Sequence, residues 1–222
     1  MFNSQEGPEL ETNLEEHICS DDNQDYELES QWTWWIDKNE GLSTGLDYQK
    51  NLHKIGEFST VKTFWSYFNN LPDVSSIECG FSYHLMKGDL RPVRENNEIA
   101  NGGQFKIKCN TEFSSEVWLE ILMAVIGEKL SELLDENDDF IGIRFGRRKR
   151  EDTIQIWNSD ASKVSKNKII NRIEELLPKK IDSYEYKSFK DLNKQYEDEF
   201  SERNRHQNRH QNRHKNSKKR SS

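Results

Sequence analysis

The chain has 222 residues, of which 32 % are hydrophobic and 32 % are charged, and its formal net charge is −8. This length suits one compact domain of about 150–180 residues with flexible tails. Three cysteines are too few and too scattered for a disulfide framework or a zinc site, and no apolar run reaches the ~18 residues of a membrane span. Composition therefore argues against a secreted protein stabilised by disulfides and against association with a membrane. It predicts a cytoplasmic or nuclear protein.

The chain begins with a strongly acidic segment. Residues 1–30 carry ten acidic side chains and no Lys or Arg. The segment lacks apolar periodicity, so it cannot bury enough surface to offset the entropy of ordering. We expect a disordered acidic tail over 1–30, followed by a single domain over 31–190.

Within that domain, alternating and helical apolar spacings predict strands and helices in irregular order. In chain order we expect strands at Trp32–Asp37 and Gln49–Ile55, a helix capped by Ser59 and running to Asn70, strands at Phe81–Met86 and Phe105–Cys109, a helix from Ser114 or Ser115 to about Leu134, strands at Phe140–Phe145 and Thr153–Trp157, a helix from Asp160 or Ser162 to Leu177, and a strand at Ile181–Tyr186. Few β-α-β spacings occur, so the pattern favours an α+β fold with a mostly antiparallel sheet.

The chain ends in a basic, repetitive segment. Residues 201–222 carry eight basic side chains and one acidic one, and they repeat an Asn-Arg-His-Gln unit. Such low complexity cannot form a core, so we expect a flexible basic tail over 191–222. The tail is either a solvated appendage or an auxiliary contact for RNA phosphate. A third, weaker interpretation is metal binding by its regularly spaced histidines.

Catalytic signatures are absent from the sequence. It has no phosphate-binding loop, no Gly-x-Ser-x-Gly elbow and no Cys/His metal spacing, so we expect a binding protein without metal or cofactor. The basic run Arg147–Arg150 lies between two predicted strands, where it is either a phosphate clamp or a solvated or nuclear-targeting loop. Abundant Trp and Tyr fit base stacking, although most such rings belong to cores.

A chain of short motifs resembles the eukaryotic initiation factor 4E family. They are Trp32-Thr33-Trp34-Trp35, Asn51-Leu52, Thr60-Val61-x-x-Phe64-Trp65, Pro92-x-x-Glu95, Asn101-Gly102-Gly103, Trp118 with Ile126-Gly127-Glu128, and Ile156-Trp157. They span about residues 30–190 in order and without large gaps. Further runs, such as Ser82–Met86 and Glu151–Asn158, are most similar to the type 3 branch.

The resemblance implies a curved eight-stranded sheet with three helices packed on its convex face. It also implies that the concave face binds the 7-methylguanosine cap of messenger RNA. In the family, two aromatic rings sandwich the base, a Glu binds its Watson–Crick edge, and basic residues hold the triphosphate. Methylation at N7 makes the base cationic, which explains the attraction of ring faces and of a carboxylate.

Carried over by position, the resemblance assigns the stacking positions to Tyr48 and Arg94, the guanine edge to Glu95, the phosphates to Arg148 and Arg150, and the methyl contact to Trp157. Tyr48 is a reasonable replacement for Trp. Arg94 is the main departure, because it replaces a ring with a charge of the same sign as the methylated base. Gln104 is a second departure, since the most studied relatives carry a basic residue there.

The resemblance further implies a partner surface on the convex back. Its carried-over positions are Val61, Trp65, Leu119, Glu120 and Leu122. In the family, these positions grip a helical Tyr-x-x-x-x-Leu-hydrophobic motif of an initiation factor 4G-like scaffold or of 4E-binding regulators. Without the resemblance, simple core packing is the default interpretation of Trp65.

Three functions remain in competition at this point. The first is a cap-binding module that promotes or regulates translation initiation. The second is an interaction protein with a weak cap site, because of Arg94, that sequesters translation factors through its back. The third, a cap-processing hydrolase, is disfavoured because no metal-binding acidic cluster is present.

Overall fold

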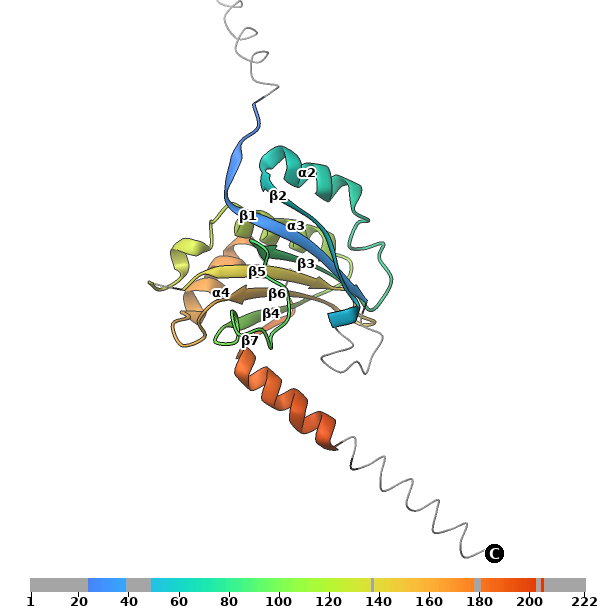
Figure 1. Ribbon diagram of the computed structural model, residues 1–222, viewed down its shortest axis with the longest axis vertical. Coiled ribbons are helices and arrows are strands. Elements are labelled where there is room, and N and C mark those ends of the chain that lie inside the picture. Colours follow the sequence, from blue (N-terminus) through green and yellow to red (C-terminus); the bar gives the residue numbers. More distant parts are fainter. Residues whose placement is uncertain (1–23, 39–48, 137, 178–180, 203–204, 206–222) are drawn as a thin grey trace, which may run out of the picture.

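The computed structural model describes residues 24–38, 49–136, 138–177, 181–202 and 205. One antiparallel sheet forms its centre, with the strand order β2-β1-β3-β5-β6-β4-β7 (Figure 1). The strands are β1 (Glu27–Lys38), β2 (Leu52–Thr60), β3 (Phe81–Lys87), β4 (Gly103–Cys109), β5 (Phe140–Gly146), β6 (Asp152–Asn158) and β7 (Ser183–Ser188). Within the described ranges there are thus seven strands, and the eight-stranded sheet expected from the resemblance is wrong by one.

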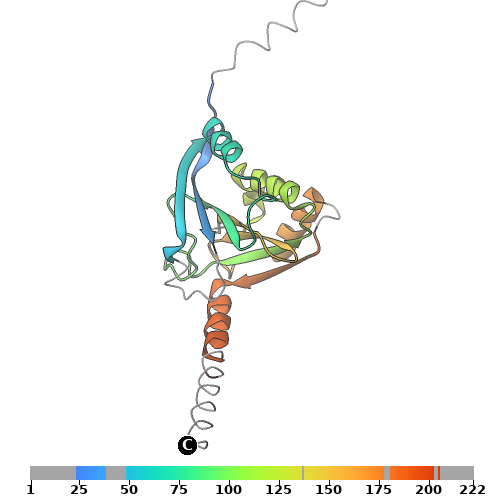
Figure 2. The same cartoon turned by 90° about the vertical axis from the view of Figure 1, so that its right-hand side faces the viewer.

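The predicted helices are present, with shifted ends. They are α2 (Val61–Asn70), α3 (Ser114–Ile126) and α4 (Lys166–Leu176), and a single 3-10 turn, η1 (Ser131–Leu133), follows α3. These helices lie on one side of the curved sheet (Figure 2). A further helix covers 189–202, so it begins at the end of the expected domain and continues into the expected tail over 191–222, and it projects away from the domain.

Local hydrogen bonding sets the start of α2. Thr60, rather than Ser59, is the N-cap: its hydroxyl accepts from the Thr63 backbone N–H at 3.2 Å, and the Thr63 hydroxyl accepts from the Thr60 N–H. This reciprocal capping box satisfies two backbone donors that have no partner inside the helix. Ser59 instead remains in strand β2, which continues to Thr60.

The other two helices are shorter than the sequence predicted. Helix α3 ends at Ile126 because Gly127 is its C-cap and Glu128 takes a positive φ of 54°, which stops the helical repeat. Helix α4 begins at Lys166, because the Asp160 carboxylate accepts from the backbone N–H and hydroxyl of Ser162 and stabilises a turn there.

Two apolar clusters cover the two faces of the sheet. The larger one packs α2, α3 and α4 against the strands, with Trp34, Phe64 and Trp118 among its fully or almost fully buried members. The smaller one lies on the opposite face, hereafter the open face, and consists of Trp35, Leu52, Met86, Val93, Ile99, Ile141, Trp157 and Phe189. The segment between β3 and β4 and the start of the 189–202 helix therefore pack on the open face, next to the candidate site.

The described residues contain neither a membrane-spanning helix nor a metal-binding cluster. No helix in the described ranges combines the length and apolarity needed to cross a bilayer. Among the same residues, no group of three or more His, Cys, Asp or Glu side chains could hold a metal ion. Cys109 is buried, and burial raises the pKa of its thiol to about 12, so it is no nucleophile at neutral pH.

Candidate nucleic-acid interface

A row of polar side chains crosses the open face. Strand register places His84 of β3 opposite Arg144 of β5, and Arg144 opposite Gln155 of β6. Gln155 is paired in turn with Lys106 of β4, and Lys106 with Glu185 of β7. Because side chains at paired positions point to the same face, five consecutive strands contribute to one polar row.

At the β1 end of this row lies a buried charge cluster. His84 Nε2 is 2.5 Å from Asp37 Oδ2, and both side chains are fully buried. The guanidinium of Arg144 lies 3.5 Å from the same carboxylate oxygen and donates to Ser82 Oγ at 2.9 Å. Burial opposes ionisation of Asp37, but the hydrogen bond from His84 and the charge of Arg144 outweigh it and lower the pKa of this carboxyl.

His84 is neutral in this cluster, and this predicts a pH-dependent stability. Burial lowers the pKa of His84 to about 4 from an ordinary 6.5. Between these values the unfolded chain binds a proton that the native protein does not, so the free energy of unfolding falls as pH decreases through this window. We expect a loss of about 2 kcal/mol between pH 8 and pH 5 from this residue alone.

Urea denaturation at the two pH values measures this loss. His84→Gln keeps a donor for Asp37 but does not titrate, so its pH dependence should be flatter than that of the wild type. His53→Gln, at an exposed position of β2, is the matched control and should retain the wild-type dependence. Equal pH dependence of the wild type and His84→Gln would show that His84 does not titrate differently in the native state.

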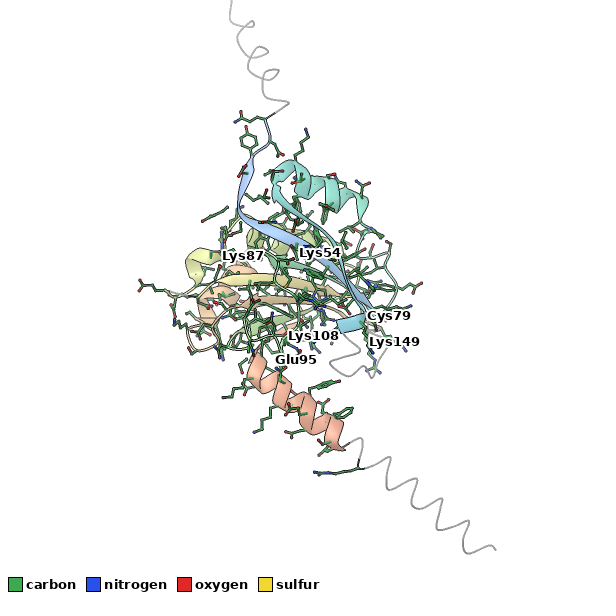
Figure 3. The ribbon with its side chains drawn as sticks, viewed as in Figure 1. Lys54, Cys79, Lys87, Glu95, Lys108 and Lys149 are labelled. Atoms are coloured by element: carbon green, nitrogen blue, oxygen red, sulfur yellow. The ribbon has the colours of Figure 1, made fainter. Side chains whose placement is uncertain are left out.

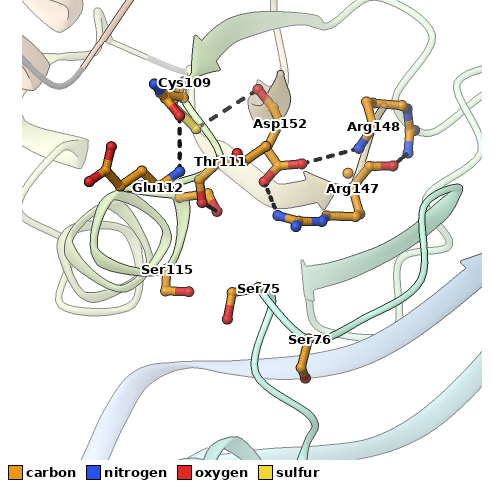
Figure 4. A network of polar contacts seen from close by, with 12 residues as sticks. Ser75, Ser76, Cys109, Thr111, Glu112, Ser115, Arg147, Arg148 and Asp152 are labelled. Carbon is orange, nitrogen blue, oxygen red and sulfur yellow. Dashed lines mark hydrogen bonds and ion pairs between the residues drawn. The ribbon is translucent and has the colours of Figure 1, made fainter. Parts of the chain in front are cut away.

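The basic loop between β5 and β6 is held by a buried carboxylate. Asp152 is fully buried and accepts from Arg147 Nη1 at 2.7 Å and from the Arg148 backbone N–H at 3.1 Å (Figure 4). The Arg148 guanidinium turns inward and donates to the carbonyls of Arg147 and Phe81. Arg148 is therefore partly committed to holding the loop, and Lys149 and Arg150 are its exposed cations.

These residues form one side of an open groove of ≈ 490 Å³. Its lining residues are Lys106, Lys108, Arg148, Lys149, Arg150, Glu151, Thr153 and Gln155. Five of the eight are basic, and the single acidic member, Glu151, pairs with Lys108 at 2.5 Å. The sequence identified Arg148 and Arg150 but missed the strand residues Lys106 and Lys108, whose alternation along β4 indicates that they share one face. Such a groove is suited to an anion with several negative groups, such as a phosphate chain.

The groove adjoins the positions assigned to the base. Trp157 is only 2 % exposed, packs edge-to-face on Phe189 with ring centroids 4.9 Å apart, and donates its indole N–H to Gln155 Oε1 at 3.4 Å. Gln155 lines the groove, so it links the Trp157 ring edge to the basic residues.

The remaining assigned residues lie on the segment between β3 and β4 or outside the described residues. Glu95 is exposed and projects over the lower part of the molecule as drawn (Figure 3), whereas Arg94 is half-buried. Tyr48, the expected first stacking residue, lies outside the described residues. The structure therefore leaves the aromatic sandwich itself as a prediction.

On the helical side, the expected partner positions are only partly at the surface. Val61 and Trp65 on α2 are each 37 % exposed, and on α3 Leu119 is half-buried and Glu120 exposed. Leu122 is fully buried, so its assignment to a partner surface is corrected: its side chain belongs to the core. Met123, half-buried and one turn beyond Leu119, faces outward in its place, and helical i, i+4 spacing could have identified it.

Fold and site together define an α+β module with a basic groove on one sheet face and an exposed Trp on the opposite, helical side. The family model for eukaryotic initiation factor 4E matches residues 27–205. The chain belongs to this family. Family members are cap-binding translation factors and not enzymes.

Individual relatives support the assignment. The chain is 35 % identical over 135 residues to initiation factor 4E-1 of Hordeum vulgare, and 36 % identical over 138 residues to isoform 4E-2 of Zea mays. These alignments cover 61 % and 62 % of this chain and the same shares of the two relatives. The chain thus matches about three fifths of the length of these relatives.

Solved structures show the same fold. Caenorhabditis elegans eIF4E-3, in a complex with the 4E-binding protein Mextli and a cap analogue, matches with a TM-score of 0.66 and 24 % identity over 77 % of this chain and 96 % of that one. Ascaris suum eIF4E-3 with an m7G cap matches with a TM-score of 0.63 and 23 % identity over 74 % of this chain and 92 % of that one. Both are 4E-3 proteins, and these matches show that the fold is shared.

Proposed function

We propose that this chain binds the 7-methylguanosine cap of messenger RNA on the open face and acts in translation initiation. The observation that carries this proposal is the contact between Trp157 and the basic groove through Gln155. A ligand in the groove would meet cations for its phosphates, with the buried Trp157 ring directly behind Gln155 on the same strand pair. In this arrangement Glu95 accepts from the guanine edge, and Lys149 and Arg150 lead the phosphate contacts.

Fluorescence titration with 7-methyl-GTP and with GTP tests the proposal. Tryptophan quenching should saturate with the methylated nucleotide, and affinity for unmethylated GTP should be at least about 10-fold lower, because the cation–π contribution depends on the positive charge of the methylated base. Equal affinity for both nucleotides would contradict cap recognition and leave a general anion site.

The helical side supports a second binding event. We propose that Val61, Trp65, Leu119, Glu120 and Met123 receive a helical 4E-binding segment of a 4G-like scaffold or a regulator. Exposed apolar residues one turn apart on α2 are suited to the apolar face of such a segment. Together the two sites would connect a capped message to the initiation machinery, in the cytoplasm and also in the nucleus.

Arg94 motivates an alternative proposal, in which the cap site is weak and the chain sequesters translation factors. Retention on a cap column, compared with binding of a 4E-binding peptide, separates the two proposals. A chain that binds the peptide but is not retained by the cap resin would support the alternative.

Arg94→Trp should strengthen binding of 7-methyl-GTP by about 10-fold. The substitution removes a charge of the same sign as the base and supplies a second stacking ring, which contributes about 1–3 kcal/mol. The gain should be smaller for GTP. Arg91→Trp, at an exposed position of the same segment, is the control and should change neither affinity. Unchanged or lower affinity of Arg94→Trp would show that Arg94 takes part in a different mode of cap binding.

A further inference from the structure

The helical side of the sheet contains a pocket that neither proposed site uses. Its volume is ≈ 220 Å³, and it lies where the end of α2 faces the start of α3. Four lining residues are aromatic, namely Trp34, Phe68, Tyr83 and Trp118, and Asp73 is the only charged residue in the lining. Such a combination of rings and one carboxylate is suited to a ligand that has both an apolar part and a positive charge.

Three of the aromatic rings form the floor of the pocket. Trp34, Tyr83 and Trp118 are each no more than 2 % exposed. The Trp34 ring meets the Tyr83 ring at 79° and the Trp118 ring at 58°, with centroids 6.5 and 6.4 Å apart. Rings at such steep angles form a concave surface, against which the methylene groups of a long side chain can pack.

The carboxylate lies at the rim and is ionised. Asp73 Oδ1 accepts from the Ser75 backbone N–H at 2.8 Å and from the hydroxyls of Ser75 and Ser115, two residues that face each other in Figure 4. Burial raises the pKa of Asp73, but these hydrogen bonds and the charge of Arg147 outweigh burial and lower it. Arg147 itself donates to Asp152 at 2.7 Å. No hydrogen bond among the described residues uses Asp73 Oδ2, so this oxygen can accept from a ligand.

The pocket is continuous with the proposed partner surface. The Phe68 ring contacts the Trp65 ring edge-on, with centroids 5.6 Å apart, and Ser115 lies one turn before Leu119 on α3. The surrounding chain is acidic: α3 has two Glu, residues 71–80 have one Asp and one Glu, and neither stretch has a Lys or Arg. A basic side chain of a partner would therefore meet complementary charge at this end of the surface.

We propose that the pocket binds an Arg or Lys side chain of the 4E-binding segment, at a position flanking its motif. The proposal rests on the proposed partner surface and deepens it. The aliphatic stem packs on Phe68 and the aromatic floor, and the charged head donates to Asp73 Oδ2. Phe68 and Asn69 lie three and four positions after Trp65 on α2, so a segment seated on Trp65 reaches the pocket within about one helical turn.

The test uses three peptides that share one Tyr-x-x-x-x-Leu-hydrophobic motif. One has Gln in the turn before and in the turn after the motif, one has Arg in the turn before it, and one has Arg in the turn after it. Because the pocket lies at one end of the partner surface, only one Arg peptide should bind the wild type more tightly than the Gln peptide, by about 10-fold in calorimetry.

Two variants of the full chain assign this gain to the carboxylate. Asp73→Asn keeps the Oδ1 acceptor for the two serines but loses the charge. It should abolish the gain of the Arg peptide and leave the affinity for the Gln peptide unchanged. Glu112→Gln removes an exposed acid just before α3 that does not line the pocket, so it is the matched control and should retain the gain.

Ser115→Phe separates a pocket from general attraction between charges. The added ring should fill the pocket while Asp73 keeps its charge, so this variant should also lose the gain. A full gain in Ser115→Phe, or equal affinities of the three peptides for the wild type, would overturn the proposal.

Failure of the Gln peptide to bind the wild type would instead contradict the proposed partner surface. In that case n-butylguanidinium, followed by NMR titration of the wild type and Asp73→Asn, tests the pocket alone. Binding that depends on Asp73 would support a site for a basic side chain, and its absence would overturn the proposal.

Discussion

Glu95→Ala is expected to lower the affinity for 7-methyl-GTP by more than 100-fold while the fold remains intact. In the proposed site Glu95 accepts two hydrogen bonds from the guanine edge, and the positive charge of the methylated base strengthens both. Loss of such a charge-assisted pair of contacts should cost about 3 kcal/mol or more. The side chain is exposed on the β3–β4 segment, outside both apolar clusters, so its removal should not affect stability.

Two further variants make this experiment specific. Glu98→Ala removes an exposed acid from the same segment and should leave affinity unchanged, which separates a direct contact from a general effect of charge. Glu95→Gln keeps one acceptor but loses the charge, so its affinity for 7-methyl-GTP should lie between those of the wild type and Glu95→Ala. Undiminished retention of Glu95→Ala on a cap column would remove Glu95 from the site.

The strands of the sheet could be predicted from the sequence because their apolar side chains recur in local patterns. Each predicted strand overlaps an observed one, including Phe105–Cys109 within β4 and Thr153–Trp157 within β6. The eighth strand had no local pattern of its own and came from the resemblance alone. Local pattern was therefore the better guide to the strand count in the described part of the chain.

Helix ends were harder to predict, because competing local hydrogen bonds decide them. Beyond α3, Leu130, Leu133 and Leu134 continue an apolar pattern that suggested a longer helix. The positive φ of Glu128 interrupts the helix, and the chain re-enters the core through a 3-10 turn. Apolar spacing alone does not reveal such a break, because the residues on both sides of it are buried or half-buried in the same cluster.

The candidate site was predictable in its location but not in the orientation of its side chains. The basic run indicated an anion-binding loop, and the loop does line a basic groove. That Arg148 turns inward depends on Asp152 and on the Phe81 carbonyl, which lies 67 positions away in the sequence. By contrast, the choice of Met123 over Leu122 was accessible to the sequence, because Met123 lies one helical turn after Leu119.

Trp65→Ala should abolish binding of a peptide that carries the Tyr-x-x-x-x-Leu-hydrophobic motif but spare 7-methyl-GTP. Trp65 and Val61 lie one turn apart on α2 and are each 37 % exposed, so both can contact an apolar helix face. Truncation of a large aromatic residue at the centre of an interface commonly costs about 2 kcal/mol or more of binding free energy. For Trp65→Ala we expect a cost of about 3 kcal/mol, which lowers the affinity for the peptide at least about 100-fold. The cap site lies on the opposite face of the sheet and should not be affected.

Isothermal calorimetry with such a peptide and thermal unfolding of the same samples measure both consequences. The Trp65 ring also contacts Phe64 and Phe68 edge-on, with centroids 5.0 and 5.6 Å apart, so a small loss of stability is expected and must be separated from the loss of binding. Phe113→Ala removes an aromatic ring of similar exposure just before α3 and is the matched control for peptide binding. If Trp65→Ala and the wild type bound the peptide equally, Trp65 would be a packing residue of α2, and the partner surface would have to lie elsewhere.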